Sequence, residues 1–364
     1  MKRLSLLSLL LFAATIMLAQ NMNVIKSPII NSDKTILFQV KAPNANVVEL
    51  SGQFSSQNIP LVKGNDGIWS VTIDSPKPDI YPYNFIIDGT AVADPNNKTI
   101  FPNENFKASL LEIPDPNALY TINDVPHGKL HYCIYNSNVL NESRPLIVYI
   151  PAEYDKNPNK KYPVFYLVSG TTDTEETWVK AGRVNDIADN LIAQGKAEPM
   201  IIVMPYGYMN NGTPRPFTMA AAEMYSTFSD EMIKNIMPFV EENYRTLNNR
   251  ESRAIAGFSR GGGQSMFTAF KNIDKFAWLS SFSAYLIPEV MDKYFPNLVK
   301  DANSLSMLWF GVGTNDFLYD YVVKNQQYFN SKGIKYDKVE REGSHTWMHA
   351  RFCLAETLQK LFKK

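Results

Sequence analysis

The chain has 364 residues, of which 45% are hydrophobic and 20% charged, and its 36 basic and 36 acidic residues leave no net charge at pH 7. This length suggests two domains with ample core material. The balanced charge, without a Lys/Arg-rich run, does not point to nucleic acid, and two cysteines, Cys133 and Cys353, are too few for a disulfide framework.

Residues 1–20 have the pattern of a secretory signal peptide. Lys2 and Arg3 precede an apolar run over residues 4–18, and a cleavage point follows near Ala19. The run is short for a membrane span, and no later stretch is long and apolar enough to be one. We therefore expect an exported chain, secreted or periplasmic, without a membrane span.

Residues 21–114 read as a first domain built from short alternating strands. Apolar runs near 36–40, 47–52, 67–73 and 81–89 are separated by turn residues at regular spacing, which predicts an all-β sandwich. Short segments within these runs and the turns beside them are Ala42-Pro43-Asn44-Ala45, Asp66-Gly67-Ile68-Trp69, Tyr83-Asn84-Phe85, Asp88-Gly89 and Asp94-Pro95. Through these segments the domain resembles the immunoglobulin-like domains related to family-48 carbohydrate-binding modules.

Glycan binding by this domain does not follow from the resemblance. Glycan platforms stack sugar rings on exposed aromatic side chains, and Trp69, the only tryptophan of the domain, stands in a predicted strand that favours the core. Two roles remain open, which are packing on the next domain to shape its site and binding glycan independently.

Residues 115–364 read as a second domain that follows a proline-rich linker at 113–118. Predicted strands alternate with helical stretches, which indicates an α/β domain with a mostly parallel sheet covered on both faces. The strands are expected at 146–150, 163–168, 200–204, 305–313 and 336–340, and the helices near 184–194, 228–243 and 350–362.

The strongest signal lies in residues 254–265, where an apolar strand, a tight turn and a helix follow one another. The turn carries Gly257-Phe258-Ser259-Arg260-Gly261, the Gly-x-Ser-x-Gly nucleophile elbow of α/β-hydrolases. Such a turn exposes the serine hydroxyl at the top of a sheet, so Ser259 is the predicted nucleophile and the second domain is predicted to have the α/β-hydrolase fold.

A serine nucleophile needs a histidine base and a carboxylate that fixes the tautomer of the base. His345 and His349 are the histidines after Ser259, and His345 is preferred because it stands in a loop directly after a predicted strand. Asp316 closes another predicted strand and is the expected acid, with Asp320 as the alternative. Asp316 could instead be a helix N-cap.

The oxyanion hole is expected from two backbone N–H groups. One belongs to Arg260, which follows the nucleophile, and the other to Thr171, which lies in the loop after the strand at 163–168. Trp347, Tyr206 and Tyr208 are the predicted substrate contacts, because aromatic side chains at this edge of the sheet suit a flat acyl group. Neither a metal nor an organic cofactor is expected.

Segments along the second domain together carry a family resemblance. They include Pro126-His127-Gly128, Val148-Tyr149-Ile150-Pro151, Lys161-Tyr162-Pro163, Pro205-Tyr206-Gly207, Arg253-Ala254-Ile255-Ala256-Gly257-Phe258-Ser259, Gly313-Thr314-Asn315-Asp316 and His345-Thr346-Trp347. Through these segments the domain resembles the esterase-D-like family, which includes feruloyl and acetylxylan esterases of carbohydrate esterase family one, enterochelin esterases and mycolyltransferases. The family often has His-Gly where this chain has Ser169-Gly170, and often Met where it has Arg260.

The resemblance implies a secreted serine esterase that acts on feruloylated or acetylated plant polysaccharide, foremost a feruloyl esterase on xylan. An acetylxylan esterase with the same triad is the nearest alternative. A siderophore esterase is disfavoured because no basic cluster would hold a catecholate–iron anion. A catalytically silent glycan-binding protein is the alternative outside the enzymes. The sequence gives no indication of the oligomeric state.

Overall fold

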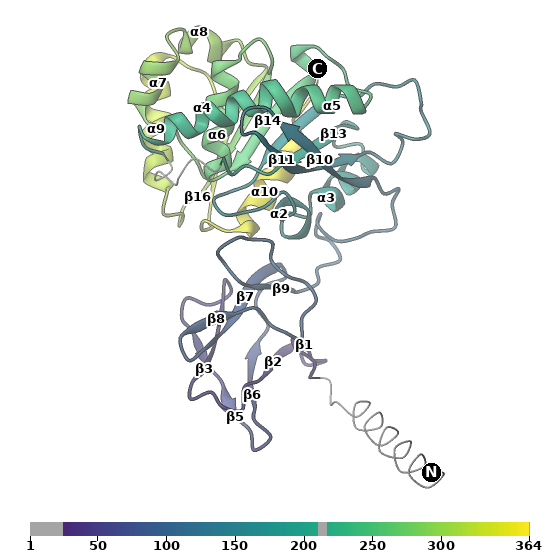
Figure 1. Ribbon diagram of the computed structural model, residues 1–364, viewed down its shortest axis with the longest axis vertical. Coiled ribbons are helices and arrows are strands. Elements are labelled where there is room, and N and C mark those ends of the chain that lie inside the picture. The colour runs from purple at the N-terminus through teal and green to yellow at the C-terminus, as the bar shows by residue number, and fades with distance from the viewer. Residues whose placement is uncertain (1–24, 210–216, 364) are drawn as a thin grey trace, which may run out of the picture. The chain divides into compact units, whose positions relative to one another are not determined.

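A computed structural model of the chain describes residues 25–209 and 217–363 (Figure 1). The predicted signal peptide lies outside the described residues. The chain divides into two compact units, of which the first holds the chain up to Pro76 together with Tyr83–Ile100, and the second holds Lys77–Pro82 and the chain from Phe101 onward. The domain boundary expected between residues 114 and 115 stays a prediction.

The first unit is all-β and is built from antiparallel strands. One sheet has the strand order β1-β2-β6-β5 and the other the order β4-β3-β7-β8. The third strand of the second sheet, β7, also pairs with β9 (Ser109–Glu112), and its first residues Ile80–Pro82 belong to the second unit. The strands are β1 (Ile29–Ile30), β2 (Thr35–Lys41), β3 (Val48–Gly52), β4 (Ile59–Pro60), β5 (Val62–Lys63), β6 (Ile68–Asp74), β7 (Ile80–Ile87) and β8 (Thr90–Val92).

Alternation of buried and exposed residues explains these strands. In β2 the side chains of Ile36, Phe38 and Val40 are buried while their neighbours are not, as the period of two in a strand requires. Trp69 in β6 is buried as well, and its indole N–H donates to the carbonyl of Ala42 at 2.9 Å. This tryptophan therefore belongs to the core of the unit, as the sequence indicated.

The second unit is built around one eight-stranded sheet with the order β10-β11-β13-β12-β14-β15-β16-β17. The pairs from β13 through β17 are parallel, whereas β10 and β11 run antiparallel to their neighbours. The strands are β10 (Lys129–Ser137), β11 (Glu142–Ile150), β12 (Val164–Val168), β13 (Ile201–Pro205), β14 (Arg253–Phe258), β15 (Trp278–Phe282), β16 (Met307–Gly313) and β17 (Asp337–Arg341).

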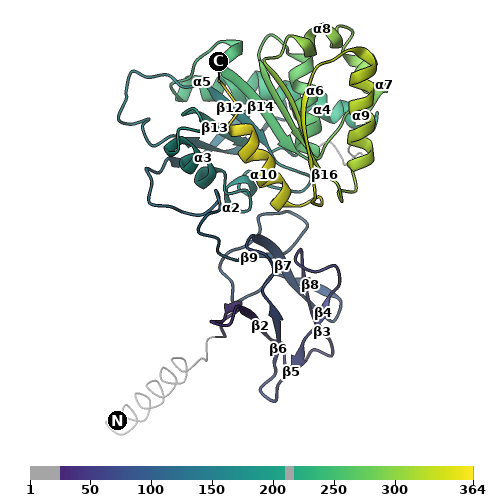
Figure 2. The same ribbon diagram turned by 180° about the vertical axis from the view of Figure 1, so that it is seen from behind.

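Helices cover both faces of this sheet, so its central strands are apolar on both sides (Figures 1 and 2). In β12, Val164 and Tyr166 pack into the core on one face, while Phe165 and Leu167 pack into the core on the other. The first face carries α4 (Ala221–Glu231), α5 (Met237–Asn243), α6 (Arg260–Lys271), α7 (Pro288–Tyr294), α8 (Leu298–Asn303) and α9 (Tyr319–Lys332). The second face carries α2 (Thr177–Lys180), α3 (Val184–Ala193) and α10 (Trp347–Leu358).

An all-β unit followed by a helix-covered, mostly parallel sheet is the fold class that the sequence predicted. The expected helix at 228–243 is in fact α4, a π-helical turn over Met232–Ile236 and α5. The C-terminal helix begins at Trp347, three residues before its expected start. No helix within the described ranges is long and apolar enough to cross a bilayer.

Candidate active site

Ser259 stands between the end of β14 and the start of α6, in a backbone conformation that non-glycine residues rarely adopt. Its φ and ψ are 55° and −124°, which costs on the order of 1–3 kcal/mol and persists only where the surroundings enforce it. The enforcing contacts are hydrogen bonds from the Ser259 N–H to the carbonyl of Phe282 and from the Gly262 N–H to the carbonyl of Ser259, both at 2.9 Å. This geometry is that of a nucleophile elbow.

Two glycines allow the elbow to form because strand and helix approach each other closely there. A Cβ atom on Gly257 would lie 2.3 Å from the carbonyl carbon of Gly261, and one on Gly261 would lie 2.5 Å from the carbonyl oxygens of Val168 and Ser169. Any side chain at either position would push α6 away from the sheet. The Gly-x-Ser-x-Gly spacing is therefore a packing requirement of this turn.

Asp316 and His345, which follow two neighbouring strands, lie in direct contact. The imidazole Nδ1 of His345 lies 3.0 Å from Oδ1 and 2.9 Å from Oδ2 of Asp316. Asp316 Oδ1 also accepts the backbone N–H of Leu318 at 2.8 Å. Parallel β16 and β17 end at the same edge of the sheet, which explains why residues 29 positions apart meet.

The environment of this pair keeps the acid ionised. Burial alone would raise the pKa of the Asp316 carboxyl, but the hydrogen bond and charge of His345 and the N–H of Leu318 outweigh it, and the pKa is lowered from its ordinary value. Asp316 is therefore a carboxylate at neutral pH, and the acceptor that it presents favours the His345 tautomer with the proton on Nδ1.

The ring of His345 contacts one phenyl ring from the elbow strand and one from the loop before α9. The centroid of Phe258, the neighbour of Ser259, lies 4.7 Å away with an interplanar angle of 30°, and that of Phe317 lies 4.5 Å away. These contacts hold His345 beside the elbow. No hydrogen bond joins the Ser259 hydroxyl to His345 among the described residues, so the complete triad belongs to the proposal below.

The loop after β12 passes directly over Ser259. A Cβ atom on Gly170 would lie 3.6 Å from the Cβ of Ser259. Over residues 25–209 and 217–363, neither the N–H of Thr171 nor that of Arg260 donates to a protein acceptor. Within these described residues no acceptor for either N–H group is recorded, and the oxyanion role of the two groups stays a prediction.

Three polar residues that the sequence did not single out support this loop. The buried Asp173 accepts the Gly170 N–H at 3.1 Å and the Asn103 side-chain amide at 2.9 Å. Burial raises the pKa of Asp173 to about 7, although Asn103, the charge of Arg260 and the Gly170 N–H lower it. Glu104 donates its backbone N–H to the carbonyl of Thr172 at 2.8 Å. Asn103 and Glu104 lie far from the loop in sequence, so no local pattern signals them.

The predicted substrate contacts lie in different environments. Tyr206 and Tyr208 follow β13 and are partly exposed, and the buried Arg144 holds their loop by donating to both of their carbonyl oxygens. Trp347 is only 3% exposed and packs against Trp178, with ring centroids 4.7 Å apart. It is the first residue of α10, and the first turn of that helix directs it into the core, so its burial favours packing over substrate contact.

His349 and the cysteines lie outside this constellation. Burial lowers the pKa of His349 to about 4, so it is neutral at physiological pH, and its Nε2 lies 3.3 Å from the Sγ of Cys353. Cys133 and Cys353 are both free thiols, and Cys353 is buried. The preference for His345 over His349 thus agrees with the contact to Asp316.

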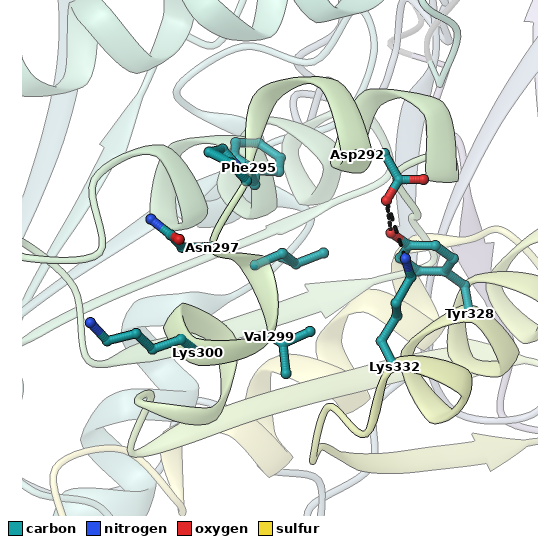
Figure 3. Close-up of a pocket in the computed structure, with 9 residues that line it drawn as sticks. Asp292, Phe295, Asn297, Val299, Lys300, Tyr328 and Lys332 are labelled. Carbon is teal, nitrogen blue, oxygen red and sulfur yellow. Dashed lines mark hydrogen bonds and ion pairs between the residues drawn. The ribbon is translucent and has the colours of Figure 1, made fainter.

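A separate hollow of about 330 Å³ lies between α7, α8 and α9 (Figure 3). Three of its polar side chains are paired, since Asp292 accepts from the Tyr328 hydroxyl at 2.6 Å and from Lys332 at 3.5 Å. It includes none of the predicted site residues. The hollow is therefore no competitor for the elbow as the reaction centre.

A family model described as "Putative esterase" matches residues 137–361, more than half of the chain. The endo-1,4-beta-xylanase/feruloyl esterase of Xylanibacter ruminicola is 29% identical over 347 residues, which cover 92% of this chain and 46% of that protein. The endo-1,4-beta-xylanase Y of Acetivibrio thermocellus is 31% identical over 179 residues, 46% of this chain and 15% of that protein. The chain thus spans less than half the length of these curated relatives.

Solved structures of esterases share the fold. A ferulic acid esterase of Anaeromyces mucronatus, solved with ferulic acid, has a TM-score of 0.60 at 25% identity and covers 69% of this chain and 98% of its own. The enterobactin esterase of Shigella flexneri has a TM-score of 0.65 at 17% identity, covers 90% and 93%, and shows the fold alone. These likenesses confirm the predicted α/β-hydrolase fold, whereas the relation of the first unit to family-48 modules stays a prediction. By the match over residues 137–361, the chain belongs to the esterase family.

Proposed function

We propose that the chain is a serine esterase that hydrolyses feruloyl and related hydroxycinnamoyl esters on plant cell-wall xylan. The observation that carries the proposal is the His345–Asp316 pair beside the strained elbow at Ser259. The substrate class rests on the names of the relatives, a xylanase/feruloyl esterase and a ferulic acid esterase solved with ferulic acid.

The proposed reaction runs through an acyl-enzyme. Asp316 holds the His345 proton on Nδ1, which leaves Nε2 to take the proton of the Ser259 hydroxyl as its oxygen attacks the ester carbonyl. The N–H groups of Arg260 and Thr171 would receive the negative charge on the carbonyl oxygen. As the C–O bond to the sugar breaks, His345 gives the proton to the leaving sugar oxygen, which departs as a hydroxyl. A water molecule, activated by the same histidine, then hydrolyses the acyl-enzyme.

An aromatic acyl group suits the surroundings of His345 better than acetate. Phe317 lies against the imidazole and is 71% exposed, so it offers a flat apolar face next to the reaction centre. Tyr206 and Tyr208 add partly exposed rings after β13. Of the three predicted substrate contacts, only Tyr206 and Tyr208 support this preference, because Trp347 is buried in the core.

An ester panel tests the proposal and its alternatives together. The protein and its Ser259→Ala variant are assayed on methyl ferulate, feruloyl-arabinose, acetylated xylan and a catecholate ester. The proposal predicts the highest kcat/KM on the feruloyl esters, and it predicts that Ser259→Ala hydrolyses none of the four substrates. Release of acetate without release of ferulate would favour an acetylxylan esterase. A preference for the catecholate ester would favour a siderophore esterase, and inactivity on all four substrates would favour a silent glycan-binding protein.

The proposal has two further parts. The N-terminal signal would export the chain, and the first unit would contribute to binding polysaccharide. Both rest on sequence patterns. Pull-down of the whole chain by insoluble xylan would test glycan binding. The Trp69→Ala chain, which lacks a buried core side chain of the first unit, would show whether binding depends on the fold of that unit.

A further inference from the structure

The side chain of Arg260 is buried next to the Gly170 carbonyl and the ring of Tyr208. It is 3% exposed, and its Nη2 donates to the carbonyl oxygen of Gly170 at 2.9 Å. The guanidinium also lies 5.9 Å from the ring centroid of Tyr208. Burial lowers the pKa of Arg260, and the charge of Asp173 works against this. A cation is costly to bury, so a specific contact has to account for its position beside the nucleophile.

The residue that Arg260 contacts is held on both sides. Asp173 Oδ2 accepts the N–H of Gly170 at 3.1 Å, while Arg260 donates to the carbonyl of the same residue. Gly170 itself lies against the Cβ of Ser259. Thr172, two residues later, has a φ of 64°, which is rare for a β-branched residue. The conformation of this loop is therefore enforced by its contacts rather than by its sequence.

The carbonyl of Gly170 and the N–H of Thr171 belong to the same peptide group. A trans peptide is planar, so its C=O and N–H bonds point in opposite directions within one plane. Fixing the direction of the carbonyl therefore also fixes the direction of the N–H. A hydrogen bond from a cation to the carbonyl additionally polarises the amide, which makes its N–H a better donor.

We propose that the Arg260 side chain is a positioning residue that orients and polarises the Thr171 N–H as the second oxyanion donor. Arg260 would then serve the oxyanion hole twice, through its own backbone N–H and through its guanidinium on the Gly170 carbonyl. Asp173 completes the clamp by holding the other side of Gly170. This inference rests on the proposed function, because it presupposes an oxyanion formed at Ser259.

The test compares Arg260→Met with a matched variant, Arg253→Met. Arg253 is also a buried arginine of the same segment, paired with Glu241 Oε1 at 2.6 Å, but it begins β14, at the opposite end of the strand from Ser259. Loss of one oxyanion donor costs about 10²–10³-fold in kcat. We expect Arg260→Met to lower kcat on methyl ferulate by about 10²-fold with KM changed less than about threefold, and Arg253→Met to keep both values near those of the unaltered protein.

A second readout separates positioning from a general packing defect. An aryl trifluoromethyl ketone forms a serine adduct that carries an oxyanion, so its inhibition constant should rise in Arg260→Met by the same factor by which kcat/KM falls. If Arg260→Met does not fold, Arg260→Lys takes its place, because it keeps the charge but loses the planar guanidinium. In this variant kcat/KM and the affinity for the inhibitor should fall by the same factor, at least about tenfold.

The outcomes are distinct from those of the proposed function. Loss of activity in Ser259→Ala together with a folded Arg260 variant that keeps its kcat and inhibitor affinity would overturn this inference alone. Equal losses in Arg253→Met would overturn it as well. Retained activity in Ser259→Ala would instead overturn the proposed function.

Discussion

Replacing Asp316 with asparagine distinguishes two possible roles of this residue, the acid of the proposed triad and the cap of the following helix. The asparagine Oδ1 can still accept the Leu318 N–H, which Asp316 accepts at 2.8 Å, so the turn before α9 should persist. The amide nitrogen would then face His345 Nδ1 at the 2.9 Å now spanned by the carboxylate. Since an amide N–H donates, Nδ1 would become the acceptor and the His345 proton would move to Nε2. Nε2 could then no longer take the proton of the Ser259 hydroxyl.

The size of the effect follows from the loss of the reactive tautomer and of the negative charge beside the imidazolium. The corresponding change in a serine protease triad lowers kcat by about 10⁴, which corresponds to about 5 kcal/mol in the activation free energy. We expect a loss of about 10³–10⁴ here. Continuous measurement of ferulate release from methyl ferulate gives kcat, and a melting curve checks that the variant is folded.

Asp320 provides the control because it is exposed and lies one helical turn further along. Asp320→Asn should stay within about threefold of the unaltered enzyme, since a surface substitution away from the site has little effect. A folded Asp316→Asn protein with near-normal turnover, together with an inactive Asp320→Asn, would refute the assignment of the acid.

Other side chains give further expectations. Phe317→Ala should lower kcat/KM for methyl ferulate by about 10-fold or more relative to an acetyl ester, the scale of an apolar pocket contact; an equal loss on both esters would point to His345 support instead. Asn103→Ala should reduce the free energy of unfolding by about 1–3 kcal/mol in denaturant titrations, because it removes a donor from the buried Asp173 carboxyl; unchanged stability would contradict the contact. Trp347→Ala should cost about 3–5 kcal/mol of stability as a core truncation, and a folded, equally stable variant with altered ester preference would restore its predicted substrate role. Burial raises the pKa of Asp173 from 3.8 to about 7 in the folded state. Between these two pH values the unfolded state binds fewer protons than the folded state, so the free energy of unfolding falls as the pH rises. The decrease amounts to up to about 4 kcal/mol, at about 1.4 kcal/mol per pKa unit. Urea titrations of Asp173→Asn and the unaltered protein from pH 4.5 to 8 should therefore show the variant gaining relative stability with rising pH, and a flat difference would contradict the raised pKa.

The parts of the site that the sequence predicts are those with local signatures. The elbow at Ser259 is recognisable because its glycines and its strand are adjacent in the chain, and close backbone approach demands them. Asp316 and His345 are found by a rule of parallel sheets, namely that functional residues follow the carboxyl ends of strands. Their contact at 2.9 Å agrees with that rule.

The parts that the sequence does not predict depend on long-range contacts. Asn103 reaches Asp173 across 70 residues, and the guanidinium of Arg260 reaches Gly170 across 90. Strand β15 was not anticipated because it is short and carries Ser280 and Ser281, which are buried nonetheless. Trp347 was expected to face the substrate from its place after the base, but the helix that begins at this residue directs it inward.

The central claim is that Ser259 is the nucleophile of a hydroxycinnamoyl esterase. Titration with a fluorophosphonate, followed by peptide mass spectrometry and by ferulate release from the same sample, tests it most directly. The account predicts one adduct per chain, located on Ser259, and a loss of ferulate release in proportion to labelling. An adduct on another residue, or ferulate release that persists after Ser259 is fully labelled, would contradict it.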